Sequence, residues 1–161
     1  MMLKIVSPKD KYKDDNIYED IERYCLDPRK TPHHYVVGYN VDMDDLSVSM
    51  YDLACYFGKL KGTRIRHMIL AFDPQKEKHI SYETAFMIAK KSCKYYASDY
   101  QIFAAVHENT EHVHIHIVMN TVSIHDGEKY KGRKKDYYAF QMHLKKTIRQ
   151  YGLKLEISSA N

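Results

Sequence analysis

The sequence predicts an α+β domain in which helices flank a central antiparallel β-sheet. Segments with apolar residues at helical spacing alternate along the chain with short apolar runs typical of strands. Two of these runs, residues 100–106 and 112–121, are separated by the polar tetrad 108–111, which predicts a hairpin and hence antiparallel pairing. The 161 residues, 44% of them hydrophobic, suffice for one core, so we expect a single domain over residues 1–161.

Helices are predicted where apolar side chains share one face. Ile17, Ile21, Tyr24 and Cys25 follow the spacing i, i+4, i+7, i+8, and Pro28 ends this helix because the residue before a proline avoids the helical region. The other helices are predicted from capping and stop residues: one from Asp44 or Asp45 to about 57, one from the N-cap Ser81 to about 96, and one over 137–150 before Gly152.

Strands are predicted where short apolar runs end at turn residues. Asp73-Pro74 closes one of these runs, and Asp126-Gly127 forms a tight turn after the hairpin. The predicted strands cover residues 35–39, 64–72, 100–106, 112–121 and 153–157.

Composition indicates a cytoplasmic protein. No run of 18 apolar residues is present, and the polar, lysine-rich start of the chain lacks a signal-peptide core, so we expect no membrane insertion. Cys25, Cys55 and Cys93 are scattered without CxxC spacing, which is typical of reduced thiols and not of a disulfide framework.

Positive charge is concentrated late in the chain, where residues 129–149 hold eight Lys/Arg against the single acid Asp136. Tyrosines interleave with these cations, a combination that fits backbone contacts and base stacking on single-stranded nucleic acid. The alternative is a merely solvated lysine-rich face. The candidate DNA-binding residues are Lys129, Lys131, Arg133, Lys134 and Lys135, with Arg66 from a second basic cluster.

Four of the ten histidines lie within residues 107–116. The last three, His112, His114 and His116, alternate with aliphatic residues, which predicts a strand with a row of imidazoles about 7 Å apart on one face. With a turn at 108–111, His107 pairs with His112, Ala105 faces His114 and Phe103 faces His116, all on one face.

A row of imidazoles on a rigid sheet suits a divalent metal ion. Three imidazoles with open coordination positions are typical of catalytic sites, because structural ions are usually enclosed by protein ligands. The alternatives are a pH-sensing cluster or a histidine-rich surface. Ligand type alone does not name the ion.

Three motifs resemble the conjugative relaxases and mobilisation nucleases, the HUH class of single-strand DNA endonucleases. The first is His107-x6-His114-x-His116 followed by Ile-Val-Met-Asn120. The second is Ile21-Glu-Arg-Tyr24-Cys-Leu-Asp-Pro28-Arg-Lys30-Thr31, with Gly38-Tyr-Asn40, and the third is Arg66-His67-Met-Ile-Leu-Ala-Phe72-x-Pro74. The resemblance covers roughly residues 15–135. The segment from His112 to Val122, with Asp126-Gly127 and Lys129-Tyr130, is similar to relaxases of mobile elements in Gram-positive bacteria.

The resemblance implies a palm-like fold, a nucleophile and a metal site. It places the nucleophilic tyrosine at Tyr24, with Tyr18, Tyr35 and Tyr39 as fallback candidates. It implies His107, His114 and His116 as ligands of Mn²⁺ or Mg²⁺, with His112 as an open alternative.

Two departures concern this site. Asn109 replaces an acid that would orient a ligand histidine, unless Glu108 or Glu111 substitutes, and Ala71 replaces a serine of the family's middle strand.

The function implied is a metal-dependent, site- and strand-specific relaxase that nicks the transfer origin of a mobile element by tyrosine transesterification. The expected product is a 5′-phosphotyrosyl intermediate that starts conjugative transfer. The expected partners are single-stranded or hairpin DNA at the origin together with accessory and coupling proteins, and no small-molecule cofactor is expected. The chain would be the N-terminal catalytic portion of a longer protein. One alternative is a non-catalytic single-stranded DNA-binding or replication-initiation accessory; another is a metal-binding protein without DNA.

Overall fold

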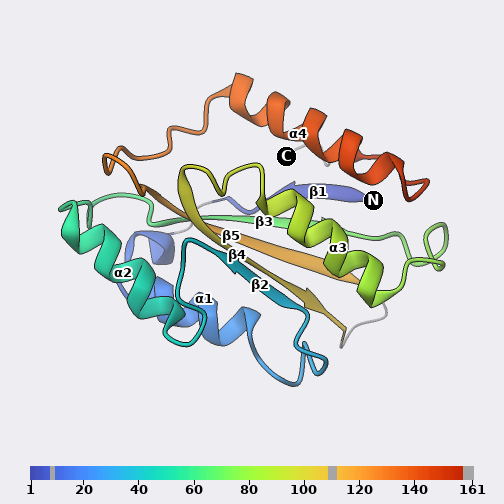
Figure 1. Cartoon of the computed structure of the whole chain (residues 1–161), viewed down its shortest axis with the longest axis horizontal. Coiled ribbons are helices and arrows are strands. Elements are labelled where there is room, and N and C mark those ends of the chain that lie inside the picture. Colours follow the sequence, from blue (N-terminus) through green and yellow to red (C-terminus); the bar gives the residue numbers. More distant parts are fainter. Residues whose placement is uncertain (8–9, 109–111, 158–161) are drawn as a thin grey trace.

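The computed structural model describes residues 1–7, 10–108 and 112–157, which build one six-stranded sheet with helices on both faces (Figure 1). The strand order is β2-β4-β5-β3-β1-β6, antiparallel throughout except for the β1–β6 pair. The predicted α+β class with a central antiparallel sheet is therefore confirmed. In chain order the elements are β1 (Met2–Ile5), the 3-10 helix η1 (Asp10–Lys13), α1 (Ile17–Cys25), β2 (Val36–Tyr39), α2 (Leu46–Tyr56), β3 (Ile65–Ala71), α3 (Tyr82–Cys93), β4 (Tyr100–His107), β5 (His114–Ser123), α4 (Lys134–Arg149) and β6 (Glu156–Ile157).

Side-chain alternation along the central strands sends residues to two different helix pairs. Ile102, Ala104 and Val106 of β4 join an apolar core with α3 and α4. The intervening Phe103 and Ala105 join a second core with α1 and α2. Figure 1 shows these helix pairs on opposite sides of the sheet. In the part of the chain that the structure describes, no helix combines the length and apolarity needed to cross a membrane.

The strand β1 was not predicted, because it has only four residues and contains a lysine. It pairs antiparallel with β3 and parallel with β6, which joins both ends of the described chain to one edge of the sheet. The N-terminal ammonium also donates to Glu77, so the start of the chain is held by charge as well as by backbone pairing.

The N-termini of α3 and α2 are capped in different ways. Ser81 accepts from the Thr84 N–H at 3.2 Å, as predicted for the start of α3. Asp45 occupies the N-cap of α2 but makes no side-chain cap bond, so its predicted capping role is wrong. The Glu22 carboxylate of α1 instead accepts from the Ser47 N–H at 2.9 Å, which fixes α1 against the start of α2.

The β4–β5 hairpin has a different register from the one predicted. His107 pairs with His114 and Ala105 with His116, a shift of two residues on β5. His112 lies before the strand and not in it. The connection is longer than a tetrad, since β4 ends at His107 and β5 begins at His114; residues 109–111 of the predicted turn lie outside the described residues. A two-residue shift keeps every side chain on its predicted face.

Candidate metal centre and nucleophile

Three imidazoles converge where β4 ends and β5 begins. One ring nitrogen from each of His107, His114 and His116 lies within 4.8 Å of the others. The observed register explains this, because His107 directly opposes His114 and His116 follows on the same face. His107 and His116 are buried and His114 is half-buried, so the cluster is open on one side.

Each of these imidazoles is oriented by a hydrogen bond through its other nitrogen. His107 Nε2 donates to the Cys25 carbonyl at 3.0 Å, and His114 Nδ1 donates to the His112 carbonyl at 2.9 Å. A carbonyl can only accept, so these nitrogens carry the hydrogen and the ring lone pairs lie on His107 Nδ1 and His114 Nε2. His116 Nδ1 lies 2.8 Å from His67 Nε2.

The remaining nitrogen of His116 is the least satisfied polar atom of the cluster. His116 Nε2 is buried and has no hydrogen-bond partner among the described residues. A buried polar atom without a partner costs about 1–3 kcal/mol. The cluster therefore offers nitrogen donors on three oriented rings, one of them otherwise unsatisfied, and this donor set fits a divalent metal ion.

Burial keeps His107 and His116 neutral in the metal-free protein. It lowers the pKa of His107 to about 4 and the pKa of His116 to about 2. Neighbouring imidazoles and the Lys30 ammonium lower both values further. Both rings therefore carry lone pairs at neutral pH, as metal ligands must.

Tyr24 stands beside the cluster in the last turn of α1. Its ring centroid lies 5.7 Å from that of His107 and 5.3 Å from that of His116, and its side chain is 46% exposed. The next residue, Cys25, supplies the carbonyl that holds His107, so one helix end fixes both the phenol and an imidazole. Burial raises the pKa of Tyr24, which keeps the phenol protonated at neutral pH.

The Lys30 ammonium covers the Tyr24 ring. Lys30 Nζ lies 3.6 Å from the ring centroid and donates to the Tyr24 carbonyl at 3.3 Å. A cation so close to the phenol favours its ionised form. Sequence reasoning missed this residue, because a lysine five residues after the end of α1 has no periodic signal.

The three fallback tyrosines lie elsewhere. Tyr18 is buried and packs edge-on against Tyr51. Tyr35 Oη donates to Glu83, and Tyr39 Oη donates to the Lys90 carbonyl. Of the four candidate tyrosines, only Tyr24 makes ring contacts with the three-histidine cluster in the described part of the chain.

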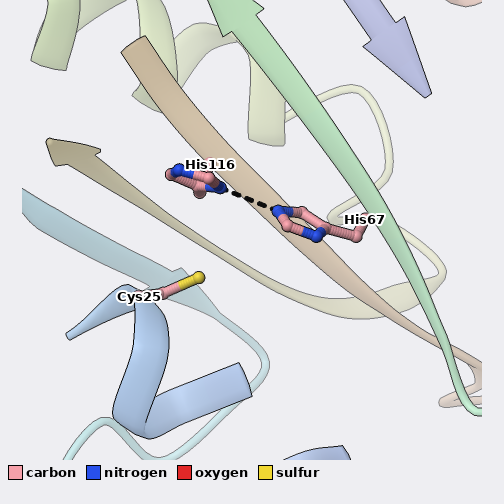
Figure 2. A group of neighbouring side chains, drawn as sticks. All are labelled: Cys25, His67 and His116. Atoms are coloured by element: carbon pink, nitrogen blue, oxygen red, sulfur yellow. Dashed lines mark hydrogen bonds between the residues drawn. The ribbon is translucent and has the colours of Figure 1, made fainter. Parts of the chain in front are cut away.

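A fourth histidine, His67 of the neighbouring strand β3, contacts the cluster through His116 and was not predicted as a site residue. Figure 2 shows it bonded to His116, with Cys25 close by. Cys25, His67 and His116 form a second group with metal-ligand spacing. It is the weaker candidate, because burial raises the pKa of the Cys25 thiol far above its usual range and the two imidazoles are already bonded to each other.

The expected acidic support is not provided by Glu108. Its carboxylate lies 2.7 Å from His33 Nδ1, away from the ligand set. Asn109 and Glu111 lie outside the described residues. Ala71 pairs with His114 in the β3–β5 ladder, so the missing serine hydroxyl would have stood next to a candidate ligand.

The predicted DNA-binding residues separate into two groups. Lys129 and Lys131 line a groove of about 410 Å³ with Arg66, which lies 5.1 Å over the Tyr130 ring. Lys129 Nζ donates hydrogen bonds to the Lys61 and Thr63 carbonyls, at 2.9 and 2.6 Å. Three further cations, Arg133, Lys134 and Lys135, are exposed at the start of α4.

The groove and the histidines lie toward opposite ends of β5. Thr121, which lines the groove, is five residues from His116 along the strand. At about 3.3 Å per residue this separation is roughly 17 Å.

The sequence matches a relaxase family model and curated relatives from Staphylococcus aureus. The family model described as "Relaxase: MobA/VirD2-like, nuclease domain" matches residues 8–153. Two proteins named "Protein rlx" from Staphylococcus aureus are 28% identical over 97 residues and 25% identical over 116 residues. These alignments cover 60% and 72% of this chain but 29% and 36% of the relatives, so the chain spans about a third of their length.

Solved structures with the same fold include a relaxase domain, that of MobM. The MobM relaxase domain bound to plasmid pMV158 oriT DNA, in a Mn-bound crystal structure at pH 6.8, matches with a TM-score of 0.60 at 14% identity, over 98% of this chain and 89% of that one. The same domain bound to a 26-nucleotide oriT DNA matches with a TM-score of 0.60 at 16% identity, over 99% and 91%. The family match over nearly the whole chain shows that this protein belongs to the relaxase family, as a MobA/VirD2-like nuclease domain.

Proposed function

We propose that this domain is a metal-dependent, site- and strand-specific DNA relaxase that nicks the transfer origin of a mobile element through Tyr24. The observation that carries the proposal is the Tyr24 phenol beside three oriented imidazoles. The relatives are about three times as long as the aligned region, which supports a catalytic portion within a longer protein that starts conjugative transfer.

The proposed reaction is a transesterification. Tyr24 Oη forms a bond to the phosphorus as the bond to the 3′ oxygen of the preceding nucleotide breaks. The phenolic proton is lost and the departing 3′ oxygen gains one, which leaves a 3′-hydroxyl and a 5′-phosphotyrosyl enzyme. The phosphoester is conserved, so the strand can later be rejoined.

His107, His114 and His116 would hold the metal ion. When bound, a divalent ion supplies a Lewis acid that neutralises the non-bridging oxygens of the scissile phosphate. The Mn-bound state of the MobM domain supports manganese, and the all-nitrogen donor set argues against Mg²⁺, which prefers oxygen ligands. The exposed side of Tyr24 leaves room for a DNA strand to approach.

Lys30 would assist the nucleophile. Burial raises the pKa of Tyr24, so the phenol needs nearby positive charge to ionise. The Lys30 ammonium over its ring supplies one such charge from the protein itself. The Lys30–Tyr24 carbonyl bond also holds this ammonium in place when no DNA is present.

The cations around the start of α4 would track the DNA backbone. Arg133, Lys134 and Lys135 stand at the positive end of the helix dipole, where basic residues are unfavourable unless an anion neutralises them. A phosphate is the natural anion for a helix N-terminus, so this arrangement supports contact with single-stranded or hairpin DNA. Accessory and coupling proteins would act on the complex.

The proposal is tested by trapping the covalent product. The protein is incubated with Mn²⁺ and single-stranded oligonucleotides that tile the transfer origin of the element encoding it, and adducts are separated on denaturing gels. We expect a nick and a protein–DNA adduct that disappear in Tyr24→Phe and on chelation. Tyr56→Phe, an exposed tyrosine of α2, is the matched control.

Two outcomes would contradict the proposal. Tight DNA binding without any adduct would indicate a non-catalytic accessory with the same fold. Adduct formation that persists in Tyr24→Phe would assign the nucleophile to another residue.

A further inference from the structure

His116 differs from the other two candidate ligands in what orients it. His107 and His114 donate to backbone carbonyls, of Cys25 and His112. His116 Nδ1 instead meets a side chain, His67 Nε2, at 2.8 Å (Figure 2). His116 is therefore the candidate ligand whose support a point mutation can remove directly.

The support continues into a buried tyrosine. His67 Nδ1 lies 3.0 Å from Tyr12 Oη, and both side chains are nearly fully buried, at 5% and 3% exposure. Tyr12 belongs to η1, and its carbonyl accepts from the Arg64 N–H at 2.8 Å, next to the start of β3. The chain His116–His67–Tyr12 thus ends on backbone fixed to the same sheet.

We propose that His67, backed by Tyr12, is the positioning residue that orients His116 and sets its tautomer for metal binding. This inference rests on the proposed function, because it assigns His116 a metal-binding role. It goes beyond it by naming a support built from neutral groups where an acid at position 109 was expected.

The tautomers follow from the geometry. His116 can bind an ion only through Nε2, because Nδ1 faces His67. Nδ1 then carries the hydrogen and donates to His67 Nε2, which must present a lone pair. His67 in turn carries its hydrogen on Nδ1 and donates to Tyr12 Oη. Three residues from three separate elements thereby define one protonation pattern.

Sheet geometry makes this contact specific. His116 pairs with Ile69 across the β3–β5 ladder, and His67 lies two residues from Ile69 on the same face. It is therefore a diagonal neighbour of His116, within reach of a long side chain. On this face of β3 the flanking residues, Ile65 and Ile69, are apolar, so the hydrogen bonds of His67 to His116 and Tyr12 compensate for the burial of its polar ring.

Metal affinity, measured by titration calorimetry with MnCl₂ in the absence of DNA, tests the proposal. Loss of an outer partner of a ligand histidine typically weakens metal binding about 10–100-fold. We expect that loss in His67→Leu. His67→Gln, whose Oε1 can accept from His116, should retain most of the affinity. Tyr12→Phe should lie between them, and His143→Leu, a hydrogen-bonded histidine of α4, should bind as the unsubstituted protein does.

The protonation pattern gives a second readout that holds if His67→Leu fails to fold. Long-range ¹H–¹⁵N spectra of the Zn²⁺-loaded domain should show both His116 and His67 as Nδ1–H tautomers. Any other tautomer at His116 would overturn the proposal, as would unchanged Mn²⁺ affinity in a folded His67→Leu.

Failure of the two proposals is distinguishable. If Mn²⁺ binds and His67→Leu weakens it but no DNA adduct forms, the positioning role stands and the transesterification fails. If adducts form and His67→Leu binds Mn²⁺ normally, the function stands and the positioning role fails. If the unsubstituted protein binds no Mn²⁺, both fail.

Discussion

The two faces of the sheet carry different side chains: one is apolar, and the other includes the candidate metal ligands. Toward α3 and α4, the central strands present an apolar core in which buried Phe140 packs with residues such as Ile115 and Ile117. Toward α1 and α2, the alternate positions of the same strands carry His67, His107 and His116. Because strand residues alternate, β5 can serve both roles with no change in its backbone.

A second contrast lies within the α1/α2 face. Under α2, buried Asn120 is satisfied by the Met50 carbonyl and the Gln101 side-chain oxygen, both at 2.9 Å. Beside the end of α1, buried His116 Nε2 has no partner among the described residues. Asn120 is therefore a buried polar group whose hydrogen bonds support the fold, whereas His116 keeps an unsatisfied nitrogen where a metal ligand is expected.

Removing an aromatic anchor from the apolar face should produce the largest change in stability. Phe140→Ala deletes a fully buried side chain, and we expect a loss of about 3–5 kcal/mol in the free energy of unfolding. Urea unfolding measures this loss, and calorimetry on the folded fraction should give unchanged Mn²⁺ affinity. A large drop in affinity would show that the two faces are not independent.

Removing a candidate ligand should strongly weaken metal binding and leave the stability of the metal-free protein nearly unchanged. His114→Ala should weaken Mn²⁺ binding more than about 100-fold, the upper range for losing only an outer partner. The half-buried ring contributes little to the core, so unfolding of the metal-free protein should change by less than about 0.5 kcal/mol. Equal losses of stability and affinity would contradict the division between faces.

Acid should destabilise the metal-free protein through the histidine face. Histidines of the unfolded chain titrate near pH 6.5, whereas burial lowers the pKa of His107 to about 4 and that of His116 to about 2. Below about pH 6.5 the unfolded state binds more protons, so stability is full above that pH and falls as pH decreases toward the folded values.

The pH dependence is measured from urea midpoints between pH 7 and pH 5 under chelation. Phe140→Ala should lower the whole curve without changing its shape, whereas His107→Gln should flatten it. A urea midpoint that stays constant between pH 7 and pH 5 would contradict the prediction.

The smallest effect is expected at Lys30. Lys30→Met keeps an apolar side chain over the Tyr24 ring but removes the charge. Adduct formation should slow roughly tenfold, equivalent to about 1.4 kcal/mol, with Mn²⁺ affinity maintained or slightly increased. Single-turnover rates measure the effect, and Lys78→Met, an exposed surface lysine, is the control. No change in rate would leave Lys30 a structural partner of Tyr24 only.

Local pattern was enough for most elements and for the identity of the converging histidines. Period-two alternation placed His114 and His116 opposite the apolar residues of β5, and helical spacing placed Tyr24 on α1. The β4–β5 register was wrong by two residues, because it depends on a connection whose length is not encoded in strand periodicity. The capping of α2 was also wrong, because Glu22 comes from a different helix.

The sequence by itself determined the fold class, the family and a set of chemically plausible ligands, because these depend on residue type and short-range spacing. Only the tertiary structure decided that His107 opposes His114, that Tyr24 rather than three other tyrosines meets them, and that His67 and Tyr12 stand behind His116. Apart from the His107–His114 pair of the hairpin, these contacts join residues at least 49 positions apart, and strand pairing and helix packing, not local periodicity, bring such groups together.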